Sequence, residues 1–223
     1  MLPIGVDILG MSRGAITFVF DDGYREVLEH VVPVLDKHDM PGVFAVPLRF
    51  NDEPAAEVAS WENWSAKLQN SGHELAAHSA THADLTRLPA DKLDYELRMP
   101  AEQLGAETLV YPGGAYDARV LSAATAYYAA ARTTEWGFEA LPPREPLQLR
   151  TVNYSRRNWS LWKANLRVFW AWLTNAWLIE TYHLVTNEPS DYEFTVPLDD
   201  FKKHLAFVTR LGISVKAIKA VCS

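Results

Sequence analysis

Short apolar runs alternate with amphipathic stretches along almost the whole chain, and this alternation limits the folds that the chain can adopt. Most of the runs lack a period-two pattern, as is typical of strands buried on both faces. Strands are expected at residues 15–20, 42–47, 73–77, 108–111, 127–132, 147–152, 178–185 and 213–218. Helices are expected at residues 24–37, 62–70, 91–104, 118–125, 158–176 and 198–210. The alternation predicts an α/β fold with a parallel sheet.

The length of the chain favours an incomplete barrel. About seven strand–helix units fit into 223 residues, whereas a full eightfold (β/α) barrel needs roughly 250 residues. We therefore expect an incomplete (β/α) barrel of about seven parallel strands, in a single domain over residues 1–223. In such a fold the functional groups lie at the carboxyl ends of the strands.

Charge and composition exclude several classes of protein. A net charge of −7 argues against a nucleic-acid-binding protein, which needs a basic surface. Cys222 is the only cysteine, so neither an intrachain disulfide nor a thiolate metal cluster can form. The opening "MLPIGVDILGMSRGA" lacks the features of a secretory signal, so we expect a cytoplasmic protein. No apolar run is long enough for a transmembrane helix, although peripheral contact with a membrane stays open.

Two adjacent acids follow the first predicted strand, in the stretch "FVFDDGY". Asp21 and Asp22 would repel each other and lose hydration there, so they need a partner. His78 and His82, in "GHELAAHSATH", follow another predicted strand and are four residues apart, which lets both imidazoles point at one ion. One of the two carboxylates can complete an Asp/His/His metal site, and the other then stays free as a base.

These motifs resemble those of the polysaccharide deacetylase family, also called the NodB-homology group or carbohydrate esterase family four. "FVFDDGY" resembles its first motif, "GHELAAHSATH" its second, "VYPGGAYD" a variant of its third and "LIETYHLV" its last. The four motifs occur in the family's order and extend from Ile16 to His183, over most of the chain. The resemblance implies a distorted barrel with fewer βα units than the standard one.

The resemblance also implies roles for individual residues. Asp21 matches the family's general base, and Asp22, His78 and His82 match its metal ligands. His183 in "TYHLV" matches the histidine that protonates the leaving amine. Members of the family remove acetyl groups from N-acetylated sugars with the help of a divalent metal. We expect zinc, while cobalt, nickel, manganese or iron could also occupy such a site.

The segment Tyr111, Pro112, Gly113 and Gly114 is expected to contact the substrate. Its two glycines allow the main chain to come close to a ligand, so the N–H of Gly113 could stabilise a developing oxyanion.

One departure from the family's pattern concerns the arginine that many members carry just before the proline of the third motif. Val110 and Tyr111 stand there in this chain. We hypothesise that Arg150 replaces the missing cation, reaching the site from the sixth strand and pairing with Asp21. The partner that tunes His183 is not evident from the sequence.

Several other aromatic and imidazole side chains have simpler interpretations. Trp159, Trp162, Leu166, Trp170, Leu173 and Trp177 form one helical stripe that is expected to be mostly core, with a sugar platform or a lipid contact as the alternatives. His38 and His204 lie on predicted amphipathic helices, where solvated or locally hydrogen-bonded side chains are expected.

The sequence thus predicts a metal-dependent hydrolase that removes an N-acetyl or other N-acyl group from an amino sugar. An envelope polysaccharide precursor linked to a nucleotide or a lipid is the expected substrate. Two alternatives stay open. One is an amidase acting on a small non-sugar amide or imide, and the other is a catalytically silent carbohydrate-binding relative.

Overall fold

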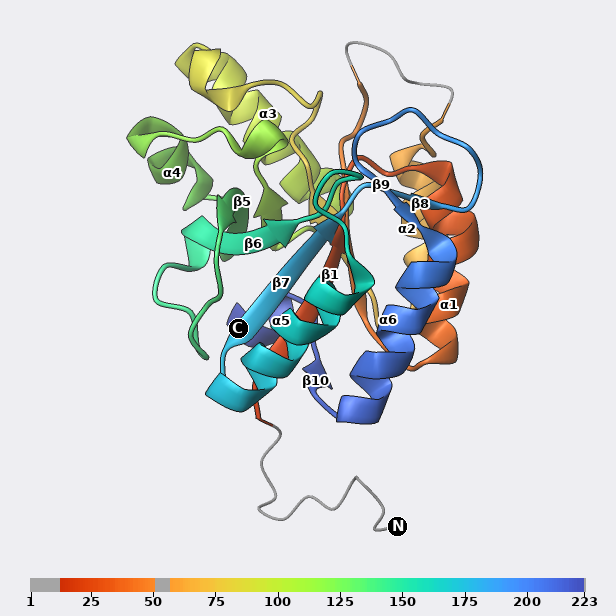
Figure 1. Cartoon of the computed structure of the whole chain (residues 1–223). Helices are drawn as coiled ribbons and strands as arrows, with labels where there is room; N and C mark the ends of the chain where they lie inside the picture. Colours follow the sequence, from red (N-terminus) through yellow and green to blue (C-terminus); the bar gives the residue numbers. More distant parts are fainter. Residues whose placement is uncertain (1–12, 51–56, 223) are drawn as a thin grey trace, which may run out of the picture.

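Seven parallel strands close into a barrel in the computed structural model, which describes residues 13–50 and 57–222 (Figure 1). Neighbouring strands pair in chain order, and the barrel closes because β1 pairs with β7 along its whole length. The strands are β1 (Ala15–Phe20), β2 (Gly42–Val46), β3 (Glu74–Ala77), β4 (Thr108–Val110), β5 (Ala130–Trp136), β6 (Leu149–Asn153) and β7 (Trp177–Tyr182). The predicted α/β barrel of about seven parallel strands is confirmed.

Helices cover the outside of the barrel between successive strands (Figure 1). They are η1 (Val27–Val31), α1 (Val32–Lys37), α2 (Trp61–Leu68), η2 (Leu85–Arg87), α3 (Ala90–Leu104), η3 (Pro112–Gly114), α4 (Ala118–Ala124), η4 (Pro146–Gln148), α5 (Leu161–Thr174) and α6 (Leu198–Leu211). A last short helix, α7 (Lys219–Cys222), follows the final strand and packs against the interior of the barrel. No helix among these is both long and apolar enough to cross a bilayer.

Helix ends are marked by local sequence signals. The Asp117 side chain accepts a hydrogen bond from Val120 N (2.8 Å) at the start of α4. Gly105 and Gly212 end α3 and α6 in the left-handed conformation that glycine adopts readily. Asn175 ends α5 in the same way, and its Oδ1 accepts from Gly14 N (2.9 Å). This last bond ties the end of α5 to the start of β1.

Side chains alternate between the barrel interior and the helix layer. In β1, Ala15 and Val19 belong to the interior core, whereas Ile16, Phe18 and Phe20 pack against the helices. This period-two alternation determines which residue at each strand end faces the mouth of the barrel.

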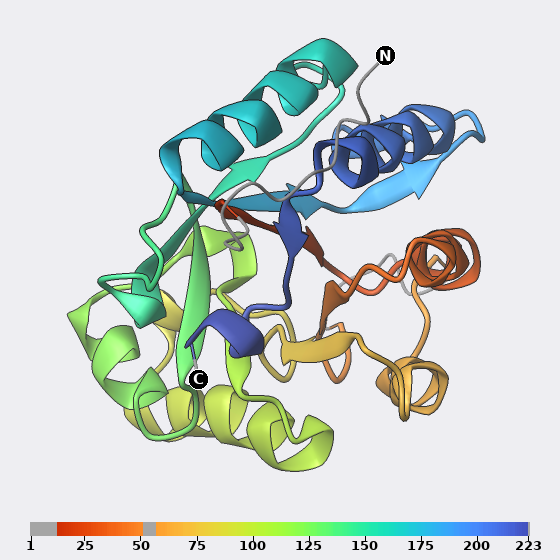
Figure 2. The same cartoon turned by 90° about the horizontal axis from the view of Figure 1, so that it is seen from below.

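The end of the barrel opposite the carboxyl ends of the strands is filled by the C-terminal part of the chain (Figure 2). The short strand β10 (Ser214–Val215) pairs with the first residues of β1, where β2 has not yet begun. Ala217 and Ile218 then join the interior core, and Trp177 donates its Nε1–H to Thr17 Oγ1 at 2.8 Å. This end is therefore packed.

Element boundaries differ from the sequence-based expectations at several places. The strand expected at 127–132 begins only at Ala130, and the strand expected at 213–218 is reduced to the two residues of β10. The run expected at 178–185 is divided at His183 into β7 and β8 (Leu184–Thr186), and β8 pairs with β9 (Thr195–Pro197) in a separate small sheet. The expected helix 24–37 begins with a π-helical turn, η1.

The expectation that the tryptophan-rich stripe is mostly core is wrong for helix α5. Trp162 is 68% exposed and Trp170 is 55% exposed, and Leu166 and Leu173 are exposed as well. The helix instead packs on the barrel through the small residues Ala164, Val168 and Ala171, which let it lie close to β1 and β7. Of the expected stripe, Trp177 alone is fully buried, and it belongs to β7.

A buried polar network joins β7 to the helices α5 and α6. Glu180 and His204 are both fully buried, and His204 Nε2 lies 2.9 Å from Glu180 Oε2. His204 Nδ1 lies 2.7 Å from Asn165 Oδ1 of α5. Tyr154 and Tyr182 also donate their hydroxyl groups to Glu180. Of the two expected states for His204, a solvated or a locally hydrogen-bonded side chain, the structure has the second.

Replacing His204 by leucine should destabilise the fold by about 1–3 kcal/mol, because the buried Glu180 carboxyl group and Asn165 each lose a hydrogen-bond partner. His38 is partly buried, and its Nδ1 lies 3.2 Å from the Thr209 hydroxyl, so this histidine outside the network provides the matched control. The free energy of unfolding of both variants is measured by urea denaturation monitored by circular dichroism. Equal, small losses for His204→Leu and His38→Leu would show that the network does not stabilise the fold.

Candidate active site

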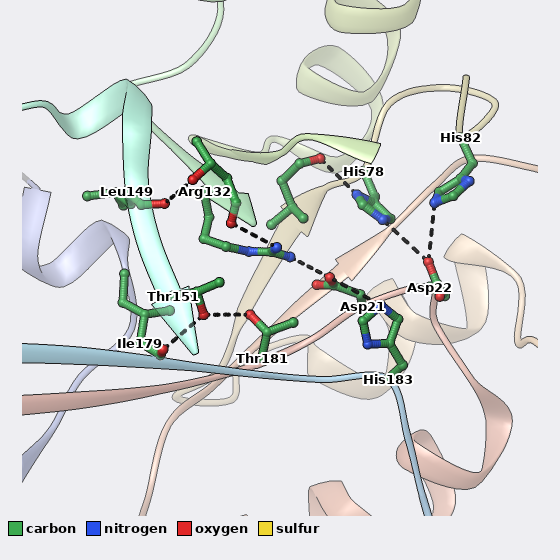
Figure 3. Close-up of polar contacts among 12 residues, drawn as sticks. Asp21, Asp22, His78, His82, Arg132, Leu149, Thr151, Ile179, Thr181 and His183 are labelled. Carbon is green, nitrogen blue, oxygen red and sulfur yellow. Dashed lines mark hydrogen bonds and ion pairs between the residues drawn. The ribbon is translucent and has the colours of Figure 1, made fainter. Parts of the chain in front are cut away.

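Asp21 lies at the carboxyl end of β1 and points into the mouth of the barrel (Figure 3). It continues the interior set of Ala15, Thr17 and Val19, and its backbone N–H donates to Tyr182 O at 2.9 Å. Arg132 of β5 donates from Nη2 to Asp21 Oδ2, and both side chains are almost completely buried. Asp21 Oδ1 is buried without a hydrogen-bond partner among the described residues. This second oxygen is therefore available to a ligand.

Asp22 turns away from its neighbour because its backbone adopts a left-handed conformation, with φ at 72°. The turn takes its carboxylate out of the line of β1 and toward the histidines that follow β3. Asp22 Oδ1 lies 3.3 Å from His78 Nε2 and 3.4 Å from His82 Nε2. Two adjacent acids thus face two different sets of partners.

His78 is held in one orientation by a main-chain contact. The ring is buried, and its Nδ1 lies 2.8 Å from Val110 O, a contact that requires the proton on Nδ1. In a neutral ring, the Nε2 lone pair would then face the carboxylate oxygen of Asp22, whereas a protonated ring would donate to it. Two lone pairs at this separation repel each other unless a cation or a proton lies between them.

Glu96 of α3 fixes the loop that carries His82. This buried glutamate accepts hydrogen bonds from Thr81 N (2.8 Å) and Thr81 Oγ1 (2.7 Å). Ala80 N donates to its backbone carbonyl at 3.1 Å. His82 itself has a positive φ of 58° and remains partly exposed, with the Phe50 ring 5.2 Å away. The sequence analysis missed Glu96, and its signal was a charged residue on the apolar face of a predicted helix.

The donor set of Asp22, His78 and His82 fits a divalent cation. One ligand atom from each residue lies within 4.8 Å of the other two. Burial alone would raise the pKa of Asp22, but hydrogen bonds from the two histidines outweigh burial and lower it well below its ordinary value. A permanently charged carboxylate beside two imidazole nitrogens is a donor set suited to zinc and neighbouring metals.

His183 stands at the end of β7, on the other side of Asp21 (Figure 3). Its Nε2 lies 3.8 Å from Asp21 Oδ2, and its buried Nδ1 has no partner among the described residues. Burial lowers the pKa of His183 below its ordinary value, and the carboxylates of Asp21 and Asp22 only partly oppose this effect. The resting imidazole is therefore neutral at neutral pH.

Aromatic residues form a wall beside His183. The Phe194 ring lies 4.7 Å from the His183 ring, and the Tyr192 ring lies 6.4 Å away and packs on Tyr24. Burial raises the pKa of Tyr24 to about 12, so its hydroxyl stays protonated.

The sequence profile of the polysaccharide deacetylase family matches residues 10–130, which is more than half of the chain. The chain belongs to the polysaccharide deacetylase family. A relative from Geobacillus stearothermophilus, described as an uncharacterized 30.6 kDa protein, is 27% identical over 124 residues. The match covers 52% of this chain and 44% of that relative, so the chain spans less than half of the relative's length.

Solved structures of deacetylases share the fold. A family 4 carbohydrate esterase from Streptomyces lividans, in complex with acetate, superposes with a TM-score of 0.61 at 14% identity, covering 95% of this chain and 97% of the esterase. The peptidoglycan deacetylase PdaC from Bacillus subtilis gives 0.59 at 14% identity, covering 94% and 90% of the two chains. At this identity the likeness establishes the fold.

The third deacetylase motif lies beside the metal-ligand set. Tyr111 is buried and uses both of its donors, the N–H to Arg132 O (3.1 Å) and the hydroxyl to Leu147 O (3.1 Å). Pro112 is buried and has no N–H. A Cβ at Gly114 would lie only 2.0 Å from Thr134 Oγ1, so this glycine is needed for packing. Gly113, with φ at 60° and open space around it, is the residue of this group that is exposed to a ligand.

The expected pairing of Arg150 with Asp21 is wrong. Arg150 donates from Nε to Glu139 Oε1 at 2.9 Å, because its neighbours Leu149 and Thr151 occupy the interior positions of β6 and turn it outward. Arg132 takes the place expected for Arg150. The signal that could have identified Arg132 is its alternation with Ala130, an interior residue of β5.

Replacing Arg132 by glutamine should lower turnover by roughly 10²-fold or more, because Asp21 loses the cation that orients it and balances its charge. Arg132→Lys should restore only part of the activity, since lysine lacks the planar donor geometry of arginine. Steady-state kinetics measures turnover, and near-UV circular dichroism checks the fold. Arg150→Gln is the control and should leave turnover unchanged. If only Arg150→Gln lowered turnover, the original pairing would be restored.

Proposed function

We propose that this chain is a metal-dependent deacetylase that hydrolyses the N-acetyl group of an amino sugar. The observation that supports this most directly is the convergence of Asp22, His78 and His82 at the barrel mouth, beside a separately held Asp21. Membership of the polysaccharide deacetylase family supports the same reaction.

Asp22, His78 and His82 would hold the divalent cation, for which we propose zinc. A cation there would polarise the amide carbonyl and lower the pKa of a coordinated water. The hydrogen bond between His78 and Val110 O keeps one ligand ring oriented before the ion binds. The anchoring of the His82 loop by Glu96 does the same for the other ring.

Asp21 is the general base in this proposal. Its Oδ2 is held by Arg132, so the free Oδ1 is left to accept the proton of the attacking water. Arg132 balances the negative charge of the carboxylate inside a mouth that excludes most solvent. Such acid–base assistance contributes about 10²–10⁴ in rate.

His183 is the general acid that protonates the departing nitrogen. Because burial keeps its resting imidazole neutral, the proton that it delivers has to be acquired during the reaction. The Asp21 carboxyl group, which would carry the water's proton on Oδ1, lies beside His183, with its Oδ2 3.8 Å from His183 Nε2, and is the source of that proton in this proposal. The same proton would thus pass from water to Asp21, then to His183 and finally to the amine.

The oxyanion that forms on the acetyl carbonyl has a candidate donor in the Gly113 N–H. The left-handed conformation of Gly113 and the open space around it let the main chain approach a ligand at this point. One such donor contributes about 10²–10³ in rate.

A cavity of about 380 Å³ lies next to Asp22 and offers room for a sugar. Its walls carry Phe50 and Trp61 as apolar surfaces and Arg25, Arg49 and Asn63 as polar groups. Cationic side chains beside the metal ligands suit a sugar that carries an anionic group. We therefore propose a nucleotide- or lipid-linked precursor as the substrate.

Metal analysis should separate the two neighbouring acids. Asp22→Ala and His78→Ala should lose the bound metal, because each removes one of three ligands, whereas Asp21→Asn should retain the metal and lose turnover. Atomic emission spectroscopy of the dialysed proteins measures the number of metal ions bound per chain. His38→Ala, away from the site, is the control. Loss of metal in Asp21→Asn to the same extent as in Asp22→Ala would remove the division of roles.

Acetate release should identify the reaction. The wild-type protein loaded with zinc should release acetate from N-acetylated sugars, but no product from small ureides or imides. His183→Ala should slow acetate release by about 10²-fold or more while sparing substrate affinity, since the lost group acts on the leaving nitrogen. Turnover of ureides alone would favour an amidase. Sugar binding without any turnover would favour a carbohydrate-binding protein.

A further inference from the structure

The outer face of helix α5 presents an apolar surface to solvent. Trp162, Leu166, Phe169, Trp170 and Leu173 are 40–68% exposed, and their spacing puts them on one side of the helix. These five residues, the α5 face, account for most of the large apolar side chains exposed among residues 13–50 and 57–222. Figure 2 shows that α5 lies at the periphery of the molecule.

Packing of the barrel does not require these side chains. The inward side of α5 consists of the small residues Ala164, Val168 and Ala171, and a Cβ added at Gly14 would lie 2.5 Å from Ala171 O. The helix is therefore already as close to the barrel as its backbone permits. Polar residues on the outer face would leave this packing unchanged, yet large apolar ones occupy it. A contiguous exposed patch of this kind marks an interaction site.

The charged side chains of α5 itself have one sign. Lys163 and Arg167 lie along one edge of the patch, and α5 contains no acidic residue although the chain carries a net charge of −7. Lys163 is exposed and forms no ion pair with any residue that the structure describes. Arg167 lies over the Tyr154 ring, 5.6 Å from its centroid. The surface thus combines apolar side chains with positive charge.

We propose that the α5 face binds the surface of an anionic lipid bilayer. Tryptophan, phenylalanine and leucine on one side of a helix, bordered by lysine and arginine, are typical of helices that lie in the membrane interface. A second copy of the chain fits less well. A symmetric contact through α5 would place Lys163 of each copy against a helix that carries no acid to balance it.

The position of α5 also suits an enzyme that works at a membrane. The segment before the helix is bound to the carboxyl ends of β6 and β7, with Tyr154 N donating to Thr181 O (2.9 Å) and Asn158 Nδ2 donating to Asn153 O (2.9 Å). Trp162, in the first turn of α5, is therefore at the end of the barrel that carries the candidate active site. A bilayer in contact with the α5 face would lie beside the mouth of the barrel. The membrane proposal does not depend on the proposed deacetylase reaction.

Vesicle co-sedimentation tests the proposal with the full chain. The protein should pellet with vesicles of phosphatidylglycerol and phosphatidylcholine in equal parts, and added sodium chloride should reduce this binding. Trp170→Gln should weaken binding on the order of tenfold, because an interfacial aromatic anchor is lost. Lys163→Glu should weaken it by at least about fivefold, as expected for one charge at an anionic surface.

Matched controls come from exposed residues elsewhere in the chain. Trp136 is 67% exposed on β5 and Lys92 is exposed on α3, so Trp136→Gln and Lys92→Glu should bind vesicles like the wild type. Absence of wild-type binding would overturn the proposal, as would equal losses in the α5 variants and the controls. Light scattering measures the molar mass in solution and so tests whether a second copy of the chain covers the α5 face instead. A wild-type dimer that Trp170→Gln converts to a monomer, without vesicle binding, would assign the α5 face to a second copy of the chain.

Discussion

The buried ion pair between Asp21 and Arg132 is the interaction on which the candidate site depends. A lone carboxylate inside the barrel mouth would lose hydration without compensation, so burying it there would cost free energy. Arg132 reaches it from β5, on the opposite side of the barrel, and satisfies one carboxylate oxygen. The other oxygen is left free. The ion pair therefore stabilises the charge and also determines which atom can accept a proton.

Backbone conformation separates the functions of two consecutive residues. Asp21 continues the β1 alternation and faces the interior, whereas the left-handed backbone of Asp22 directs the next carboxylate to His78 and His82. Non-glycine residues adopt this conformation at some energetic cost, and such strain is concentrated at functional sites. Asp21 and Asp22 are identical in type and adjacent in sequence, and the turn at Asp22 is what directs their carboxylates to different partners.

The fold and most of the site could be predicted because they depend on local patterns. Runs of apolar residues revealed the strands, and motif spacing pointed to His78 and His82 with one of two neighbouring acids. The resemblance to the deacetylase family selected Asp22 as that acid, and the structure brings the three residues together. Arg150 was misassigned because the alternation of side chains along β6 points it away from the barrel interior. The expected bounds of that strand did not show which of its residues point inward. The stripe on α5 was misassigned for a different reason. A helical pattern shows that apolar residues share a face, but it does not show whether that face points to the barrel or to solvent.

The packed end of the barrel has a consequence for the order of events in catalysis. Trp177, Ala217 and Ile218 fill the interior at that end, so the described part of the chain leaves no passage through the barrel. Reactants and products therefore enter and leave through the mouth of the barrel at the opposite end. In a deacetylation the freed amine and the acetate would therefore have to depart in the direction from which the sugar and the water arrived. Product release from the mouth of the barrel then limits how soon the next substrate molecule can bind.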